Sequence, residues 1–151
     1  MAWIILACLI IDQLSKYLVS HFMILGQSIS VIDNVFYLTY VLNTGAGFSI
    51  LEGARWFFVI LTIIILAAVF FLLKHVPKSY RFFRCMIAVF VGGVLGNFID
   101  RLLYGHVIDF FDFQFFPVFN IADCCLTVSV IIMCVLLLFG KESKLLETKQ
   151  K

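Results

Sequence analysis

The stretch Trp56–Leu73 reads WFFVILTIIILAAVFFLL and carries no charged side chain along its whole length. A helix must present roughly 20 predominantly apolar residues to cross the hydrocarbon core of a bilayer. The stretch therefore predicts a transmembrane helix, and it is the clearest of the spans in this chain. It sets the fold class, because the other long apolar stretches are interpreted as its neighbours in a helical membrane bundle.

The composition extends this interpretation to the whole chain. Of the 151 residues, 64% are hydrophobic, and the mean hydropathy is +1.12. Ordinary soluble domains are only about half apolar. We therefore predict an all-α membrane protein that forms one integral membrane domain over residues 1–151. Its four spans are expected at about residues 2–22, 56–73, 83–104 and 117–139.

Two of the expected spans have distinctive features. The apolar run Ala2–Ile11 has the size of a signal-peptide core, but no Lys or Arg precedes it and no small-x-small cleavage site follows. We expect this run to be retained as part of the first span. The third span contains Gly92 and Gly96, whose four-residue spacing would let a neighbouring helix approach closely.

The basic residues gather in two places, and these predict the orientation in the membrane. Eight of the eleven Lys and Arg residues lie in segment 74–84 or in the tail 141–151. Because cytoplasmic loops carry an excess of Lys and Arg, both segments are expected inside. Four spans then place both termini in the cytoplasm and segments 23–55 and 105–116 on the outer side.

The first outer segment has the composition of strands rather than of a disordered loop. Ile29–Ile32 and Val35–Val41 are rich in β-branched and aromatic residues, and Asp33-Asn34 separates them, which predicts a short hairpin or bent strand pair. Asn43–Gly47 supplies flexible backbone, and Phe48–Leu51 is expected to form a short amphipathic turn or helix on the membrane.

Five aspartates lie within or beside the apolar runs. A charge at the bilayer centre costs roughly 2.5–3.5 kcal/mol even on the lenient insertion scale. Such groups must pair, face water or take part in chemistry, and their clustering toward the outer side favours chemistry. The five are Asp12, Asp100, Asp109, Asp112 and Asp123.

Some of these polar residues also have a simple structural interpretation. Asp12 and Lys16 are four residues apart on one helix face, as expected of a pair that neutralises itself within a span. Asn97, Asp100 and Arg101 are equally compatible with the polar end of a helix.

The remaining aspartates suggest acid–base chemistry. Asp109 lies in the second outer loop, and Asp123 lies in the second turn of the fourth span, three residues after Asn120. A carboxylate near a helix start also interacts well with the helix dipole, which is the simple interpretation of Asp123. Two acids meeting at one depth would support amide hydrolysis, with one ionised and the other protonated. Asp112 competes with Asp109 for this role on composition alone.

Other chemistries fit the sequence less well. The histidines His21, His75 and His106 fall on both sides of the membrane and form no metal site. The five cysteines lie in or beside apolar runs without metal-ligand spacing and are interpreted as small hydrophobic residues. No basic face is available for nucleic acid. We therefore expect no metal, no cofactor and no nucleic-acid partner.

As a set, the motifs resemble those of the lipoprotein signal peptidase family, also called signal peptidase II, which are membrane aspartic peptidases of bacteria. The resemblance covers nearly the whole chain, although no basic leader precedes the first span. The five motifs, in order, are Asp12-x-x-x-Lys16, Asn43-x-Gly45-Ala46-Gly47-Phe48, Gly96-Asn97-x-x-Asp100-Arg101, Val107-x-Asp109-Phe110 and Phe119-Asn120-x-Ala122-Asp123.

The resemblance implies a four-helix membrane fold with an outward-facing β-cradle and a short periplasmic helix. It implies that Asp109 and Asp123 form the catalytic dyad, which decides against Asp112. It also implies a substrate class, because the family removes signal peptides from prolipoproteins just before a cysteine that carries diacylglycerol. The partners would be these diacylglyceryl prolipoproteins and the lipid of the bacterial inner membrane. The supporting and substrate-binding residues would be Asp12, Lys16, Asn43, Gly45, Asn97, Asp100, Arg101 and Asn120.

Within the dyad, the sequence neighbours suggest a division of roles. Asp123 follows a helix start, where unpaired backbone N–H groups favour an anion, so we expect it to be the general base. Asp109 is flanked by Phe110 and Phe111, and desolvation beside aromatic rings favours its neutral form. Asp109 is therefore the expected general acid.

Two other function classes stay open on the residues alone. A small proton-coupled transporter or channel subunit would also use intramembrane Asp and Lys residues. Such a relay needs polar groups stepped across the bilayer, whereas Trp56–Leu73 and Cys124–Phe139 contain no charge. A non-catalytic assembly factor would be insensitive to Asp→Asn substitutions.

Overall fold

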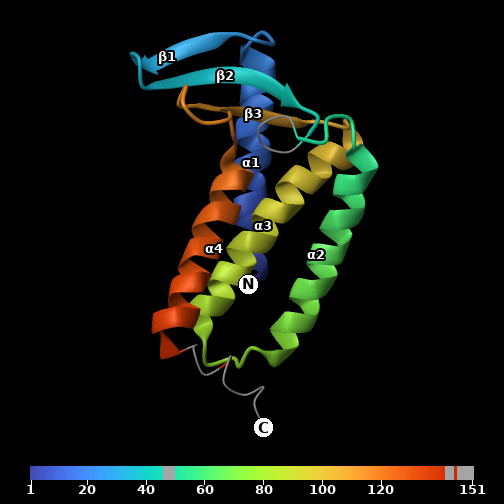
Figure 1. Ribbon diagram of the computed structural model, residues 1–151, viewed down its shortest axis with the longest axis vertical. Coiled ribbons are helices and arrows are strands. Elements are labelled where there is room, and N and C mark those ends of the chain that lie inside the picture. The colour runs from blue at the N-terminus through green and yellow to red at the C-terminus, as the bar shows by residue number, and fades with distance from the viewer. Residues whose placement is uncertain (46–49, 142–144, 146–151) are drawn as a thin grey trace.

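The computed structural model describes residues 1–45, 50–141 and 145. Figure 1 shows long helices gathered into a bundle, with a small sheet lying across one end of it. The α2–α3 connection and the last turn of α4 lie at the other end. The helices are α1 (Ala2–Phe22), α2 (Arg55–His75), α3 (Arg81–Leu103) and α4 (Ile121–Phe139), and the strands are β1 (Ser28–Ile32), β2 (Phe36–Asn43) and β3 (Val107–Asp112).

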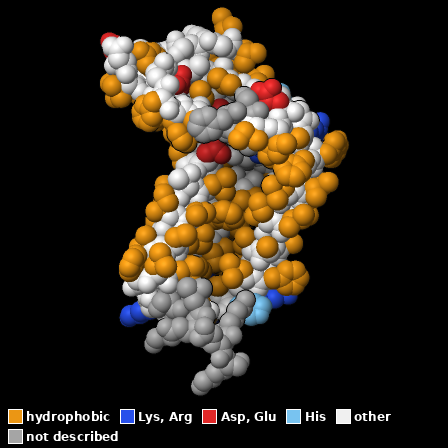
Figure 2. Space-filling view, viewed as in Figure 1, with side chains coloured by type: hydrophobic (Ala, Val, Ile, Leu, Met, Phe, Trp, Pro, Cys, Tyr) orange, Lys and Arg blue, Asp and Glu red, His pale blue; other side chains and the backbone are white. Residues whose placement is uncertain are grey.

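All four helices are long and apolar enough to cross a membrane, in agreement with the predicted spans. In α3, 44% of the most apolar window is buried, against 11% or less in the other three, so α3 is the central helix. Large apolar side chains remain exposed along the outer faces of the other helices, and many of them are visible over the helical part of the molecule in Figure 2. An apolar surface of this extent marks contact with lipid.

Glycines on α3 permit close packing against two neighbours, as the sequence predicted. A Cβ at Gly92 would lie 2.6 Å from Cβ of Cys8 on α1. A Cβ at Gly96 would lie 2.5 Å from Oδ2 of Asp12 and 3.1 Å from Cβ of Ala122 on α4. Any side chain at Gly96 would therefore push apart the three helices that carry the polar residues.

The three strands form an antiparallel sheet in the order β1-β2-β3. The predicted hairpin is confirmed, and Asn34 at its turn adopts a positive φ of 61°, which asparagine tolerates better than most residues. β3 was expected to be loop, because its sequence lies in a short connection between two spans. It is a strand because it pairs with β2, with Val41 opposite Asp109.

The start of the fourth span differs from its prediction. α4 begins at Ile121 rather than near residue 117, because Phe119 bridges to Phe111 beside the sheet and Asn120 caps the helix. Asp123 consequently lies in the first turn of α4, not the second. The expected turn or helix at Phe48–Leu51 falls partly on residues 46–49, which lie outside the described residues; 50–53 form turns.

Candidate active site

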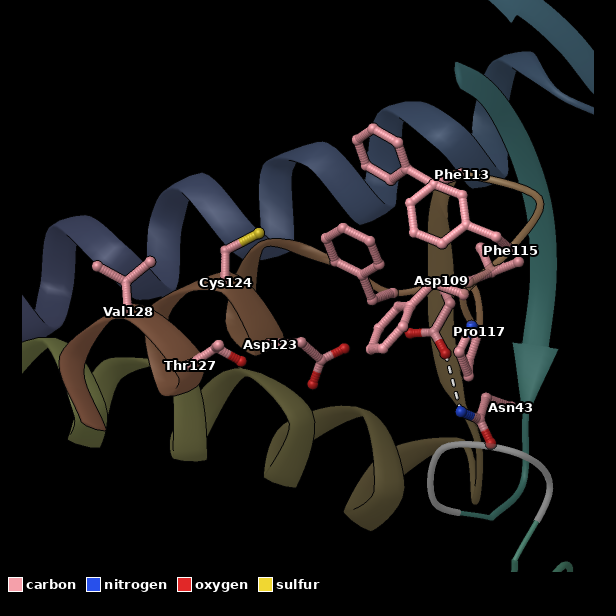
Figure 3. A pocket seen from close by; sticks show the side chains of 12 residues that line it. Asn43, Asp109, Phe113, Phe115, Pro117, Asp123, Cys124, Thr127 and Val128 are labelled. Atoms are coloured by element: carbon pink, nitrogen blue, oxygen red, sulfur yellow. Dashed lines mark hydrogen bonds between the residues drawn. The ribbon is translucent and has the colours of Figure 1, made fainter. Parts of the chain in front are cut away.

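Two aspartates from different elements face one pocket at the sheet end of the bundle. Asp109 comes from β3 and Asp123 from α4, and both line a cavity of about 540 Å³. Figure 3 shows the two carboxylates pointing into this space beside aromatic rings that include Phe113 and Phe115. The sheet therefore supplies one acid and the helix bundle the other.

Asp109 is buried, and its carboxylate accepts hydrogen bonds from two neutral side-chain amides. Its Oδ1 accepts from Nδ2 of Asn120 at 2.6 Å, and its Oδ2 accepts from Nδ2 of Asn43 at 2.9 Å. The second of these bonds is the dashed line in Figure 3. Burial and then the negative charge of Asp123 raise the pKa of Asp109 to about 7. Its carboxyl group is thus poised to carry a proton near neutrality.

Asp123 is fixed by the N-terminus of its own helix. Asn120 and Asp123 form a capping box, in which Oδ1 of Asn120 accepts from Asp123 N at 3.0 Å and Oδ2 of Asp123 accepts from Asn120 N at 3.2 Å. The remaining oxygen, Oδ1 of Asp123, accepts from Nδ2 of Asn97 on α3 at 2.8 Å. Two donors and the helix dipole interact favourably with its ionised form, while burial opposes ionisation.

A buried cluster of charged residues lies behind the dyad. Nζ of Lys16 lies 2.8 Å from Oδ2 of Asp12, 2.8 Å from Oδ2 of Asp100 and 2.9 Å from Oδ1 of Asn97. Asp12 in turn accepts from Ala122 N at 2.8 Å, and so holds the first turn of α4. The predicted Asp12–Lys16 pair forms, but it also joins α1 to α3 and α4.

The other predicted residues lie around this centre in different ways. Arg101 donates to the Gly45 carbonyl at 3.1 Å and stacks over the Phe58 ring at 4.7 Å, so it ties the segment after β2 to the bundle. Asp112 lies at the far end of β3 and does not line the cavity with Asp109. It accepts from Thr39 and from the backbone and side chain of Gln114.

Sequence reasoning missed Gln13, which is part of the charged cluster. Its Nε2 donates to Oδ1 of Asp100 at 2.9 Å, to Oδ2 of Asp12 at 3.2 Å and to the Gly96 carbonyl at 3.2 Å. The available signal was a polar residue beside Asp12 within an apolar run. Among residues 1–45, 50–141 and 145, no group of three or more His, Cys, Asp or Glu side chains is arranged to hold a metal ion.

A spanning bundle with paired carboxylates in a cavity at one end defines an integral membrane protein with a candidate hydrolytic site. The comparisons with known proteins identify the class further. The family model described as signal peptidase (SPase) II matches residues 4–139. Lipoprotein signal peptidases from Shouchella clausii and Geobacillus kaustophilus are 44% and 41% identical, over 95% and 91% of this chain and 97% and 92% of their own lengths.

Solved structures agree with the sequence matches. A bacterial membrane enzyme determined by the in meso method at 2.3 Å resolution superimposes with a TM-score of 0.84 at 37% identity, covering 99% of this chain and 92% of that chain. A second, at 1.9 Å, gives 0.82 at 38% identity, covering 93% of each chain. The chain belongs to the signal peptidase II family. It is accordingly a membrane peptidase.

Proposed function

We propose that this chain is an aspartic endopeptidase that removes signal peptides from diacylglyceryl-modified prolipoproteins, with Asp109 and Asp123 as its catalytic dyad. The observation that carries the proposal is the convergence of two carboxylates, Asp109 buried and Asp123 half-buried, on one largely apolar cavity. Like charges in a shared site resist simultaneous ionisation, so one carboxyl keeps a proton while the other is an anion. This is the pairing that amide hydrolysis requires.

The environments of the two carboxyls favour Asp123 as the general base and Asp109 as the general acid. Asp123 takes a proton from a water molecule whose oxygen attacks the scissile carbonyl carbon. Asp109 then gives its proton to the amide nitrogen, the C–N bond breaks, and a new carboxylic acid and a free amine leave. Asp109 is now the anion and Asp123 the acid, and one proton transfer restores the starting state.

The cavity walls support a lipid-bearing substrate. Phe113, Phe115, Phe116 and Val128 contribute apolar surface next to the acids. The sheet and the start of α4, which carry the two acids, lie at the end of the bundle opposite to the α2–α3 connection (Figure 1). Basic residues gather in that connection. With those basic residues in the cytoplasm, the site lies near the outer face, where an exported precursor is presented from the membrane. Cleavage just before the lipidated cysteine follows for a member of this family.

The test is incubation of the purified protein with a diacylglyceryl-modified prolipoprotein and with the same precursor lacking the lipid. We expect the lipidated form to be cut, seen as a mobility shift, and the unlipidated form to be cut poorly. Mass spectrometry of the product should place its new N-terminus at the modified cysteine. If folded protein does not cleave the lipidated form, the proposed function is refuted. If both forms are cleaved equally, the lipid plays no part in substrate recognition.

A further inference from the structure

Lys16 is a buried cation that takes no part in the hydrolytic steps above, although a single side chain separates it from the dyad. It is only 2% exposed, and its ammonium group lies within 2.9 Å of three oxygens, on Asp12, Asp100 and Asn97. An ammonium has three N–H donors and no acceptor. The contact with Asn97 is a hydrogen bond, and the contacts with Asp12 and Asp100 are ion pairs.

The contact with Lys16 fixes which end of the Asn97 amide faces which neighbour. A carboxamide can turn by half a revolution, and its orientation is decided by the groups around it. Because Lys16 only donates, it takes the oxygen of Asn97, and Nδ2 of Asn97 is left to donate to Oδ1 of Asp123 at 2.8 Å. Nδ2 of Asn120 donates to the same Asn97 oxygen at 3.1 Å, which agrees with this orientation.

We propose that Lys16 is a positioning residue that holds the Asn97 amide in the orientation that donates to Asp123, and thereby keeps Asp123 in the ionised form required of a general base. The proposal rests on the proposed function of the dyad. Without the ammonium, only the longer hydrogen bond from Asn120, at 3.1 Å, keeps the amide from turning its oxygen toward Asp123. An acceptor facing a carboxylate favours protonation of that carboxylate, which removes the base.

Lys16 also acts on Asp123 through space, but the charges around it weaken that direct effect and leave the contact through Asn97 as its main route. Asp12 and Asp100 both contact the ammonium at 2.8 Å, so the three charges together carry a net negative charge. Such a group does not by itself attract another anion. Lys16 of α1 and Arg101 of α3 both favour the ionised form of Asp123 through space, and Asp109 of β3 opposes it.

The experiment compares the pH–rate profile of the wild type with that of the double variant Lys16→Met/Asp100→Asn, which removes one charge of each sign. Both are assayed on the diacylglyceryl-modified precursor in wild-type and Asn97→Ala backgrounds, with folding checked by circular dichroism and gel filtration. We expect the acidic limb of the profile to shift to higher pH by about one unit, so that the rate at a given pH on that limb falls about tenfold. This is the size of effect expected when a carboxylate loses one hydrogen bond. The shift should vanish when Asn97 is already alanine, because the effect passes through that side chain.

Several results would overturn the proposal: an unchanged profile, a shift that is equally large in the Asn97→Ala background, or an equal loss of rate at every pH in folded protein. If the double variant does not fold, Lys16→Gln removes the charge and keeps a donor. The proposal then expects no shift in the wild-type background, and a shift of equal size in both backgrounds refutes it. Failure of the wild type to cleave the precursor would instead refute the proposed function.

Discussion

The hydrogen-bond partners of the dyad carboxylates are neutral amides and a backbone N–H rather than cations. The side-chain amides of Asn43 and Asn120 donate to Asp109. Arg101, which lies eight residues before Asp109 in the sequence, donates instead to the Gly45 carbonyl. Neutral donors stabilise an anion less than a salt bridge does. Because the cations lie one side chain away, the carboxylate oxygens have hydrogen-bond partners but no salt bridge. The pKa of Asp109 therefore stays near neutrality, as acid–base chemistry requires.

The first prediction concerns the two acids themselves. Asp109→Asn and Asp123→Asn should each lower the cleavage rate at least about 100-fold, because each removes one proton-transfer group. Asp112→Asn is the matched control on the same strand as Asp109, and it should retain activity, since Asp112 contacts Thr39 and Gln114 instead. Rates are measured on the lipidated precursor at equal amounts of folded protein. Appreciable activity in either dyad variant would contradict the assignment.

The second prediction is a pH dependence with a defined sign. The pKa of Asp109 is raised from 3.8 to about 7, so its neutral form is populated below pH 7 and lost above it. A general acid must be neutral, and the turnover number should therefore fall as pH rises through about 7. Activity should return on readjustment to pH 6; a rate that stays flat well above pH 7 would exclude Asp109 as the acid.

At the scale of secondary-structure elements, sequence predicts what depends on composition alone. The helices follow from uninterrupted apolar length, and α1 and α2 lie within two residues of their predicted limits. The hairpin follows from β-branched residues on both sides of Asp33-Asn34. β3 has the same character in Val107–Asp112, but it becomes a strand only through pairing with β2, which is distant in sequence.

The candidate site shows the same division. The motifs name residues that the fold brings to one end of the bundle, and Asn120 three residues before Asp123 already suggests a helix start. The links between helices were not predictable, because they depend on the angle at which α1 and α3 meet. The salt bridge of Lys16 to Asp100 and the three contacts of Gln13 are of this kind.

The third prediction separates the two functions of Asn120, which caps α4 and also donates to Asp109. Asn120→Ser keeps an oxygen for the cap, whereas Asn120→Ala loses it, at about 1 kcal/mol of stability. Both variants lose the amide donor to Asp109. We expect a lower thermal midpoint in detergent for the alanine variant only, and reduced turnover in both. Full activity of the serine variant would show that the donor to Asp109 is dispensable.

At the scale of the whole molecule, the two ends of the bundle differ in chemistry. Figure 2 shows most of the acidic side chains, with some basic ones, toward the sheet end, and Lys and Arg side chains without acidic ones in the described part of the other end. At that basic end, Arg84 donates to the carbonyls of Leu73 and Val76, closing the α2–α3 connection. Tyr80 reaches the Lys141 carbonyl at 3.3 Å, so the connection and the end of α4 share one membrane face.

The last prediction is the orientation that this asymmetry implies. In a background with all five cysteines replaced, Lys78→Cys lies in the α2–α3 connection and Asp33→Cys lies at the tip of the hairpin, and both positions are exposed. Because basic loops stay in the cytoplasm, an impermeant thiol reagent added to intact cells should label position 33 and leave position 78 unlabelled until the membrane is permeabilised. Activity of each single-cysteine variant on the lipidated precursor controls for correct insertion. The opposite labelling pattern would put the dyad on the cytoplasmic side, where an exported precursor does not meet it.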